Sequence, residues 1–224
     1  MSNGKANAAK KAVELVRDGA VIGIGSGTTV EIFLRELGRR IENEGLTVYG
    51  VPSSYQSHIL ATNNGIKVVD LIQYPELDIC IDGADQVDER FNCIKGGGGA
   101  LTREKIVAAA SKEVVIIVDS SKIVDRLNMP VPIEVLPFAY GFVERRLSAM
   151  GRPVLREGSG KLGPVVTDNG NFIIDCDFGD IDKPEELERE IDRIPGVVEC
   201  GIFCSELIDG VIAGYEDGAR FLKK

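Results

Sequence analysis

The chain has 224 residues, of which 44% are apolar and 27% are charged, and its formal net charge is −9. This length suffices for one sizeable domain, alone or with a small second one. The negative charge argues against nucleic acid or an anionic membrane as a partner. The sequence contains no apolar run of transmembrane length and no signal-peptide pattern at its start, so we expect a cytoplasmic protein.

Cysteine and histidine usage argues against a metal site. The five cysteines form no CxxC pair, and the single histidine, His58, lies among polar residues of an expected helix and is interpreted as a surface residue. An odd number of cysteines without a signal peptide is typical of reduced thiols. The cysteines are Cys80, Cys93, Cys176, Cys200 and Cys204.

Short apolar runs alternate with helical patterns through the first half of the chain, which predicts a mostly parallel sheet covered on both faces. Each run is followed by glycine or polar residues, and ligands of such sheets lie at the carboxyl ends of the strands. The expected strands are 20–25, 47–52, 67–71, 77–85 and 113–122, and the expected helices are 5–17, 30–45, 53–65 and the one that follows the glycines of 95–112.

From Met129 the order of elements changes to β-α-β-β-α-β, which predicts a small ferredoxin-like α+β domain over residues 129–204. A hairpin is expected at 163–178, with Asp168-Asn169-Gly170 as its turn. Residues 205–224 are expected to return to the first domain, which then comprises 1–128 plus 205–224. The remaining expected elements are helices at 142–151 and 184–196 and a strand at 197–203.

The turn Gly25-Ser26-Gly27-Thr28-Thr29 lies between an expected strand and helix. Its glycines permit close backbone approach, and the helix N-terminus and hydroxyls supply donors that suit a phosphate monoester. No lysine follows the second glycine as in a Walker A loop, and the dinucleotide fingerprint is incomplete. On these residues alone, a tight turn without a ligand is an equal alternative.

Two further segments carry groups suited to proton transfer. Asp82-Gly83-Ala84-Asp85 places two carboxylates at a strand end, although a solvated turn or a metal site is an open alternative. Lys95 precedes the four glycines Gly96 to Gly99, a costly run that indicates close approach of the backbone to another group.

Glu104 and Lys122 complete the set of candidate residues. Glu104 lies early in the helix after the glycines, where a glutamate can equally serve only to complement the helix dipole. Lys122 follows an apolar strand at its carboxyl end, and the alternative to a role in the site is an ordinary solvated lysine. Together the candidates suit proton removal next to the carbonyl of a small phosphorylated sugar.

The motifs GSGTT, VPSSYQS, DGAD, KGGGGALTREK, VDSSK, PVPIEV and VVTDNGN occur in this order and resemble those of type A ribose-5-phosphate isomerases along nearly the whole chain. The resemblance implies a Rossmann-like domain with a ferredoxin-like second domain. It also implies cofactor-free interconversion of ribose 5-phosphate and ribulose 5-phosphate, through an enediolate, in the non-oxidative pentose phosphate pathway. A homodimer or homotetramer is expected.

The resemblance also implies the roles of individual residues. Glu104 is the proton-transferring base, Asp82, Asp85 and Lys95 line the sugar site, and Gly83 and Ala84 belong to the same segment. Substrate contacts are implied for Gly96, Gly97 and Gly98, for Ser26, Gly27, Thr28 and Thr29, for Lys122 at the phosphate, and more weakly for Lys5. Gln86 stands where the family commonly has Glu, and GGGGA where GGGAA is frequent.

Other functions on related folds are a sugar-phosphate sensor, a coenzyme A transferase and an amino-sugar phosphate deaminase. A sensor needs a basic DNA-binding part, which this acidic chain lacks. The transferase needs a longer chain, and the deaminase needs a histidine partner that is scarcely available here.

Overall fold

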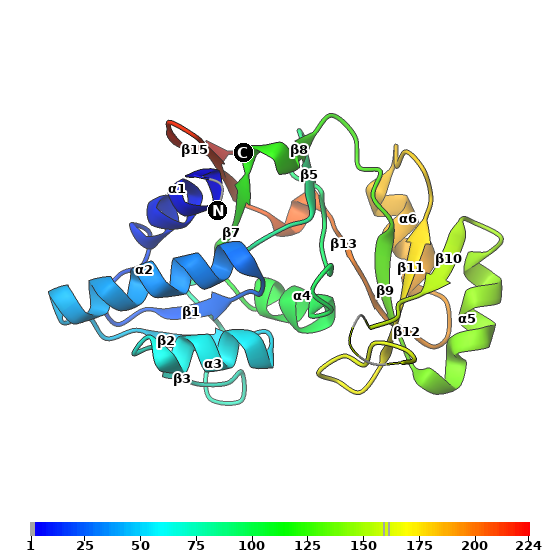
Figure 1. Cartoon of the computed structure of the whole chain (residues 1–224), viewed down its shortest axis with the longest axis horizontal. Helices are drawn as coiled ribbons and strands as arrows, with labels where there is room; N and C mark the ends of the chain where they lie inside the picture. Colours follow the sequence, from blue (N-terminus) through cyan, green and yellow to red (C-terminus); the bar gives the residue numbers. More distant parts are fainter. Residues whose placement is uncertain (1–2, 159, 161) are drawn as a thin grey trace. The chain divides into compact units, whose positions relative to one another are not determined.

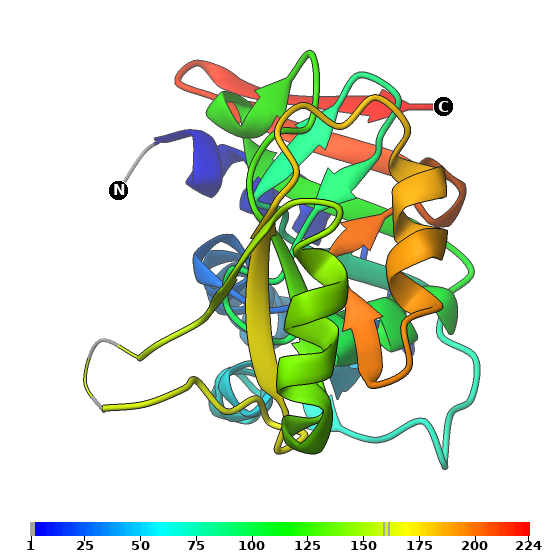
Figure 2. The ribbon, with the colours of Figure 1, turned by 90° about the vertical axis from the view of Figure 1, so that its right-hand side faces the viewer.

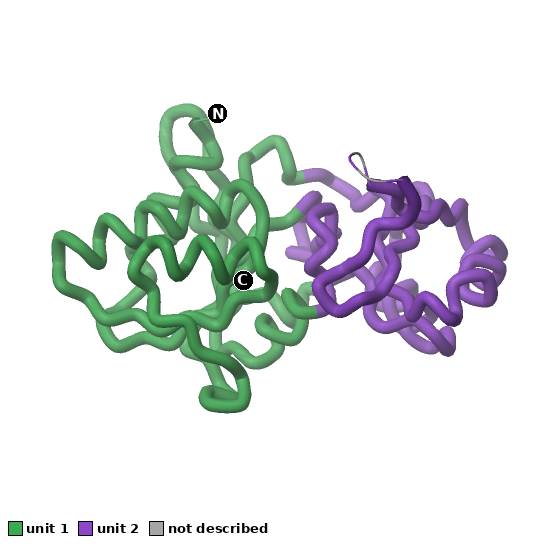
Figure 3. Tube along the Cα trace, turned by 60° about the horizontal axis from the view of Figure 1, so that its bottom comes forward, with its two compact units in different colours: residues 1–84, 103–123, 205–224 green, residues 85–102, 124–204 purple. Residues whose placement is uncertain are grey.

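The structure, a computed structural model, describes residues 3–158, 160 and 162–224. The chain divides into two compact units (Figure 3). The first comprises 1–84, 103–123 and 205–224, and the second comprises 85–102 and 124–204. Residues 85–102 thus group with the second unit by their contacts, and the domain boundaries drawn from the sequence stay a prediction.

The first unit is built on a seven-stranded sheet (Figure 1), with the order β15-β14-β7-β4-β1-β2-β3. Every neighbouring pair is parallel except the hairpin of β14 and β15. The apolar runs of the sequence form its centre, as predicted. The strands are β1 (Val21–Ile24), β2 (Tyr49–Pro52), β3 (Lys67–Val68), β4 (Ile79–Asp82), β7 (Val114–Asp119), β14 (Gly210–Tyr215) and β15 (Gly218–Lys223).

The helices of this part of the chain begin and end close to their predicted limits, with two differences. The first helix ends at Val13 and not at residue 17. The next residues form hydrogen bonds to the residue three positions earlier, as in a 3₁₀ turn, such as that from Leu15 N to Ala12 O at 3.0 Å. The second helix begins at Thr28, so both threonines of the glycine turn lie in its first turn. The helices are α1 (Asn3–Val13), α2 (Thr28–Glu44), α3 (Tyr55–Asn63) and α4 (Leu101–Ala109).

Helix α1 packs against the last hairpin of the sheet. Asn7 Nδ2 donates to the carbonyl of Tyr215 at 2.8 Å. A Cβ on Gly214 would lie 1.8 Å from the carbonyl oxygen of Gly4, so both backbones need the absence of a side chain there. Among the described residues, no helix is both long and apolar enough to cross a membrane.

The second unit contains a four-stranded antiparallel sheet with the order β10-β11-β9-β12. Helices α5 and α6 cover one face of it (Figure 2). The element sequence β-α-β-β-α-β with this order is the predicted ferredoxin-like arrangement. The elements are β9 (Val131–Val135), α5 (Tyr140–Leu147), β10 (Arg152–Leu155), β11 (Phe172–Asp177), α6 (Pro184–Asp192) and β12 (Val197–Cys200).

The predicted hairpin at 163–178 forms only in part. Its turn is present, since Gly170 N donates to Thr167 O at 2.9 Å, but the first arm contributes only isolated bridges, such as Val166 to Phe172. In the sheet, β11 lies between β9 and β10, and the sequence did not predict β10 because Arg152 and Pro153 mask its apolar alternation.

A second small sheet, with the order β13-β6-β5-β8, was also not predicted. Its strands have only two or three residues, too few to show a period of two. They are β5 (Gln86–Asp88), β6 (Cys93–Ile94), β8 (Ile123–Val124) and β13 (Ile202–Phe203), and three short 3₁₀ turns lie at Ser120–Lys122, Pro137–Ala139 and Ser205–Leu207.

A buried carboxylate, Glu134 of β9, holds several segments of the second unit together. Its side chain is fully buried. Oε1 accepts hydrogen bonds from Thr167 Oγ1 at 2.8 Å, Asn169 Nδ2 at 3.0 Å and Asn171 Nδ2 at 2.8 Å, and Oε2 accepts from Thr102 Oγ1 at 2.5 Å. One carboxylate therefore joins β9, the 168–170 turn and the first turn of α4.

We expect Glu134→Leu to lower the free energy of unfolding by at least about 3 kcal/mol, because it leaves several buried donors without an acceptor. Glu134→Gln keeps an oxygen for the donors on Oε1 and should cost less. The exposed Glu190→Gln on α6 is the control and should be neutral. Urea unfolding followed by circular dichroism measures all three, and equal effects of Leu and Gln would contradict the network's importance.

Candidate active site

The carboxyl ends of β1 and β4 form the topological switch point of the large sheet. From β1 the chain proceeds to β2 and β3 on one side, and from β4 to β7 and β14 on the other. Ligands of open α/β sheets bind at such a reversal, outside the carboxyl ends of the strands. The turn after β1 and the Asp82 segment after β4 therefore occupy the position that the fold favours for a ligand.

Asp82 is held directly against the turn that follows β1. Its carboxylate Oδ1 accepts hydrogen bonds from Ser26 N at 3.1 Å and Gly83 N at 2.7 Å. The residue is 1% exposed, and Oδ2 is buried from solvent. The predicted pairing of these two segments at one strand-end rim is thus present within the first unit.

Gly25 is required by this contact. A Cβ at position 25 would lie 1.7 Å from Oδ1 of Asp82, far inside any permitted separation. This contact lies within the protein itself, so it accounts for Gly25 without a ligand. Gly27, the N-cap of α2, has φ of 100°, a left-handed conformation that favours glycine.

Hydroxyl and ammonium groups gather around the same turn. Ser26 Oγ contacts the hydroxyl of Ser53 at 3.0 Å and donates to Ser54 Oγ at 2.7 Å. Lys5 Nζ donates to Thr28 Oγ1 at 2.9 Å, which places a positive charge at the first turn of α2. Because the start of a helix also carries partial positive charge, the turn suits an anionic group such as a phosphate.

Helix α4 runs antiparallel to the strands and brings Glu104 to the same edge of the sheet. Beyond its C-terminal end, Ala110 accepts a hydrogen bond from Leu77 N, which precedes β4, at 2.8 Å. The N-terminal end of α4, with Glu104 in its first turn, consequently points toward the carboxyl ends of the strands. The beginning of α4 and the end of β4 thus lie at one edge.

The side of α4 that bears Glu104 faces the sheet. Val107, one turn after Glu104, packs so closely on β1 that a Cβ on Gly23 would lie 2.5 Å from its Cγ1. Glu104 itself is 5% exposed, and its Oε2 is buried from solvent. A carboxylate that only complements a helix dipole is normally solvated, so the burial favours a functional role for Glu104.

Lys122 ends the short 3₁₀ turn that follows β7, the neighbour of β4 in the sheet. Asp119 caps this turn by accepting from Ser121 N at 3.0 Å. Lys122 is half-buried. The structure thus places Lys122 at the carboxyl edge of the large sheet, where the sequence predicted it.

The second unit contains the remaining candidates, Asp85 and Lys95 with the glycine loop. Lys95 directly follows β6 and is 3% exposed. Its Nζ lies 5.2 Å from the centroid of the Phe203 ring, a cation–π contact. Asp85 Oδ2 accepts from Gly97 N at 2.8 Å. The solvated-lysine alternative for Lys95 is therefore wrong.

Three of the four glycines of the loop are required, for different reasons. Gly96 and Gly99 have φ of 99° and 79°, in the left-handed region. A Cβ on Gly97 would lie 2.7 Å from Asp85 Oδ1. Gly98 has neither constraint, because a Cβ there would meet open space. The protein itself therefore explains three glycines, and the fourth leaves room for a ligand.

Gln86, the residue that departs from the family pattern, has a structural role in the second unit. It is buried, and its Oε1 accepts from Asn128 N at 2.9 Å and Met129 N at 3.0 Å, while Nε2 donates to Asn128 Oδ1 at 2.8 Å. A neutral amide suits this mixture of donors and acceptor, so the substitution is accommodated without changing a predicted site residue.

Sequence analysis did not single out Glu134, Arg156 or Asp175. The acid inside the apolar PVPIEV strand was an available signal for Glu134, because buried acids are rare unless they are hydrogen-bonded. Arg156 and Asp175 look like ordinary surface charges. Only the structure shows that Arg156 contacts the carbonyls of the glycine loop.

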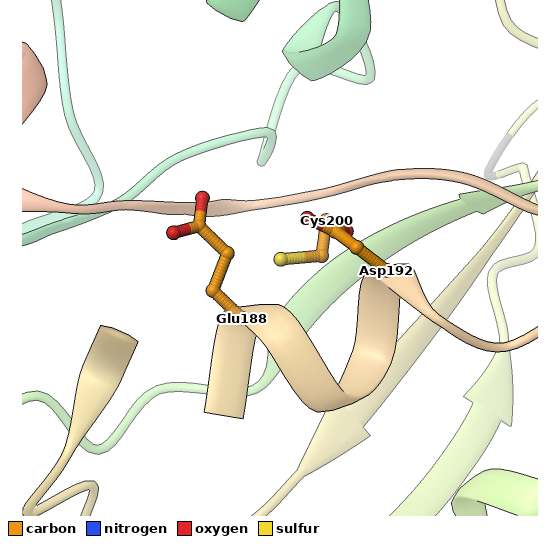
Figure 4. Close-up of side chains that lie close together, drawn as sticks. All are labelled: Glu188, Asp192 and Cys200. Atoms are coloured by element: carbon orange, nitrogen blue, oxygen red, sulfur yellow. The ribbon is translucent and has the colours of Figure 1, made fainter. Parts of the chain in front are cut away.

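Outside these segments, Glu188, Asp192 and Cys200 each bring one ligand atom within 4.8 Å of the others (Figure 4). The thiol of nearby Cys204 donates to Glu188 Oε2 at 2.7 Å. This hydrogen bond occupies a carboxylate oxygen of Glu188 that an ion would need as a ligand, and we assign no ion to the group.

The described cysteines are buried and not in disulfides. Burial raises the pKa of the Cys176 thiol to about 12, which keeps it protonated and unreactive at neutral pH. No predicted site residue is a cysteine, and the thiols belong to the packing of the units.

Residues 49–218 match the family model of ribose 5-phosphate isomerase A (phosphoriboisomerase A). The chain is 65% identical to ribose-5-phosphate isomerase A of Archaeoglobus fulgidus over 224 residues, which cover 99% of each chain. It is 51% identical to the protein of the same name from Methanococcus aeolicus over 222 residues, or 97% of this chain and 94% of that one.

Solved structures agree with this assignment. Ribose 5-phosphate isomerase A from Methanocaldococcus jannaschii superposes with a TM-score of 0.94 at 50% identity, over 98% of both chains. A D-ribose-5-phosphate isomerase in complex with phospho-erythronic acid gives 0.95 at 43% identity, over 98% of this chain and 97% of that one. Matches of this extent confirm the α/β fold class, and the chain belongs to the ribose 5-phosphate isomerase A family.

Proposed function

We propose that this protein interconverts D-ribose 5-phosphate and D-ribulose 5-phosphate through an enediolate, with Glu104 as the proton-transferring base. Membership of the isomerase family along the whole chain supports the activity. The observation that carries the assignment of the base is the buried position of Glu104 at the carboxyl edge of the large sheet. The reaction belongs to the non-oxidative branch of the pentose phosphate pathway.

The first unit supplies the base and an anion site. The hydroxyls and helix N-terminus around Ser26 to Thr29 bind the phosphate end of the sugar, together with Lys122 and Lys5. Contacts to this remote group hold the carbon chain near Glu104. Glu104 removes the proton from C2 of the aldose and returns it to C1 of the enediolate. Asp82, with Gly83 and Ala84, contacts the sugar hydroxyls and helps to open the ring.

For the second unit we propose the roles that the resemblance implies. Asp85 shares the ring-opening proton transfer with Asp82. Lys95 and backbone N–H groups of the glycine loop, in which Gly96, Gly97 and Gly98 lie against the substrate, stabilise the negative charge that develops on the C1 oxygen. Donors fixed in advance contribute most to such stabilisation, and loss of one typically costs about 10²–10³-fold in rate.

A neighbour's ligand supports this chemistry. Phospho-erythronic acid, bound to the D-ribose-5-phosphate isomerase with 43% identity, combines a phosphate with a carboxylate. A carboxylate carries two oxygens and a negative charge on a planar carbon. An enediolate carries two oxygens and a negative charge on two adjacent planar carbons, so the carboxylate resembles the proposed intermediate. We expect the same compound to inhibit this protein, with ribose 5-phosphate as the competing substrate.

The proposed reaction needs no cofactor and no metal, because a carboxylate base and fixed donors suffice for proton transfer next to a carbonyl. Activity toward ribose 5-phosphate in a coupled assay, unchanged by EDTA, tests this statement. The same assay separates the isomerase from a deaminase or a transferase, which would leave ribose 5-phosphate unchanged.

Glu104→Gln should lower kcat by about 10²–10⁴-fold with little change in KM, because it removes the base and keeps the shape. The matched control is Glu42→Gln, at an exposed position of α2, which should retain activity. The direct readout is solvent deuterium at C1 of the ketose when the reaction runs in D₂O. Near-normal turnover of pure Glu104→Gln protein would exclude Glu104 as the base.

Lys122→Ala should chiefly raise KM, because it removes a positive charge from the carboxyl edge of the sheet. Lys112→Ala is the control: Lys112 lies before β7, at the opposite edge, and pairs with Glu76 at 3.0 Å. Steady-state kinetics with ribose 5-phosphate measures both. A KM for Lys122→Ala equal to that of Lys112→Ala would remove Lys122 from the phosphate site.

We further propose a cytoplasmic homodimer or homotetramer. Several large apolar side chains of the second unit are solvent-exposed around the start of α5, which is costly for an isolated chain. Phe138 is 102% exposed and Phe142, four residues on, is 51% exposed. Leu136 and Val198 are exposed by 48% and 38%, and a backbone hydrogen bond from Leu136 N to Gly196 O brings their segments together. A second copy of the chain would cover this surface.

Phe138→Ser should shift the protein toward monomers in sedimentation velocity without lowering its thermal stability as a monomer. Ile72→Ser is the matched control, because Ile72 is an apolar side chain that is 92% exposed and belongs to the first unit. Should the unmodified protein sediment as a monomer at all concentrations, the assembly proposal would be wrong.

A further inference from the structure

The backbone of the glycine loop is fixed from two sides by charged side chains of the second unit. Asp85 accepts from Gly97 N at 2.8 Å. Arg156 Nη1 donates to the carbonyl oxygen of Gly96 at 2.8 Å and to that of Gly97 at 3.2 Å. Both peptide groups that flank Gly97 therefore have a charged partner, and their orientation is determined by side chains rather than by a helix or a sheet.

Arg156 is itself locked by Asp175. Nε donates to Oδ2 at 2.7 Å and Nη2 donates to Oδ1, a bidentate pair in which both side chains are largely buried. The two residues belong to adjacent strands of the sheet, since Arg156 directly follows β10 and Asp175 lies in β11. Bidentate pairing fixes the plane of the guanidinium, which a lysine cannot reproduce.

The guanidinium is therefore held between Asp175 and the loop carbonyls. Nε and Nη2 bind Asp175, and Nη1 binds the two carbonyls. A positive charge on a carbonyl oxygen polarises its peptide, so the N–H on the other side becomes a stronger donor. The N–H opposite the Gly97 carbonyl is that of Gly98.

Gly98 is the loop residue left open for a ligand. It is exposed, a Cβ would meet no atom within 4 Å, and no acceptor for its N–H is found among the described residues. By contrast, the N–H of Gly97 is bound to Asp85 and that of Gly99 to Gly96 O at 3.0 Å. Of the three glycines Gly97, Gly98 and Gly99, Gly98 is thus the one whose exposed N–H is available to an anion.

We propose that Arg156, held by Asp175, is a positioning residue for the isomerase reaction: it orients and polarises the Gly97–Gly98 peptide so that the Gly98 N–H stabilises the enediolate oxygen. The proposal rests on the proposed function, which places the glycine loop against the substrate. It assigns a role in the reaction to an ion pair that does not itself contact the sugar.

Arg156→Gln should lower kcat about 100-fold while KM stays within about twofold, because the donor acts mainly on charge that develops in the transition state. Asp175→Asn should lower kcat less, in the same direction. Arg156→Lys should fall between Arg156→Gln and the unmodified protein, since one ammonium replaces a fixed fork.

The chain offers a closely matched control in Arg152→Gln. Arg152 and Asp177 form a more exposed, single-bonded pair at 2.6 Å on the same two strands, and neither residue contacts the glycine loop in any described hydrogen bond. This variant reports the cost of losing an arginine–aspartate pair from the sheet. Because Arg152 is 81% exposed and Arg156 only 17%, Arg152→Gln should lower the thermal stability less than Arg156→Gln.

Inhibition provides a second readout that a purely structural role would not change. Phospho-erythronic acid should bind Arg156→Gln much more weakly than it binds the unmodified protein, because its carboxylate takes the place of the enediolate. Inorganic phosphate should inhibit both proteins equally. The ratio of the two inhibition constants isolates the loop donor from the phosphate site.

A kcat for Arg156→Gln within threefold of that for Arg152→Gln, or a change confined to KM, would overturn the proposal. If Arg156→Gln does not fold, Arg156→Lys and Asp175→Asn decide the question by the same criterion. Failure of the proposed function is distinguishable, because the unmodified protein would then not isomerise ribose 5-phosphate at all.

Discussion

The close contact between the Asp82 carboxylate and the turn after β1 is the constraint on which the first unit's site depends. Ser26 N donates to Asp82, and the carboxylate lies so close to the backbone that position 25 has no room for a side chain. The contact joins the two strands at which the sheet order reverses. Because the carboxyl ends of parallel strands share one edge, the start of α2, the start of α4 and the end of β7 lie at the same edge.

The sequence predicted this architecture well where the signal is local. Apolar runs followed by glycine turns indicated the parallel sheet, and the catalytic candidates were found because they follow those runs. Gly25 and the four glycines of the loop were singled out for close approach of the backbone to another group, and in the structure Gly25 and Gly97 approach the carboxylates of Asp82 and Asp85. Their approach to a ligand stays a prediction.

What the sequence could not show depends on contacts between distant segments. The donors to Glu134 lie 32 to 37 residues from it, and Arg156 meets Gly96 across 60 residues. Neither distance leaves a periodic pattern. The strands β6 and β13 have two residues each and exist because they pair with each other, since neither has enough residues to bury a face alone. These elements could be recognised only in three dimensions.

The contact of α1 with the last hairpin has a consequence for biosynthesis. Asn7 meets its partner Tyr215 only after 208 further residues have been made, and the backbones of Gly4 and Gly214 touch at the same place. Until then the apolar face of α1 has no surface to cover there, and β7 lacks its outer neighbour. The large sheet therefore remains incomplete until β14 and β15 have been synthesised. A nascent chain stalled before residue 210 would expose the apolar face of α1 and the unpaired edge of β7, which chaperones can bind.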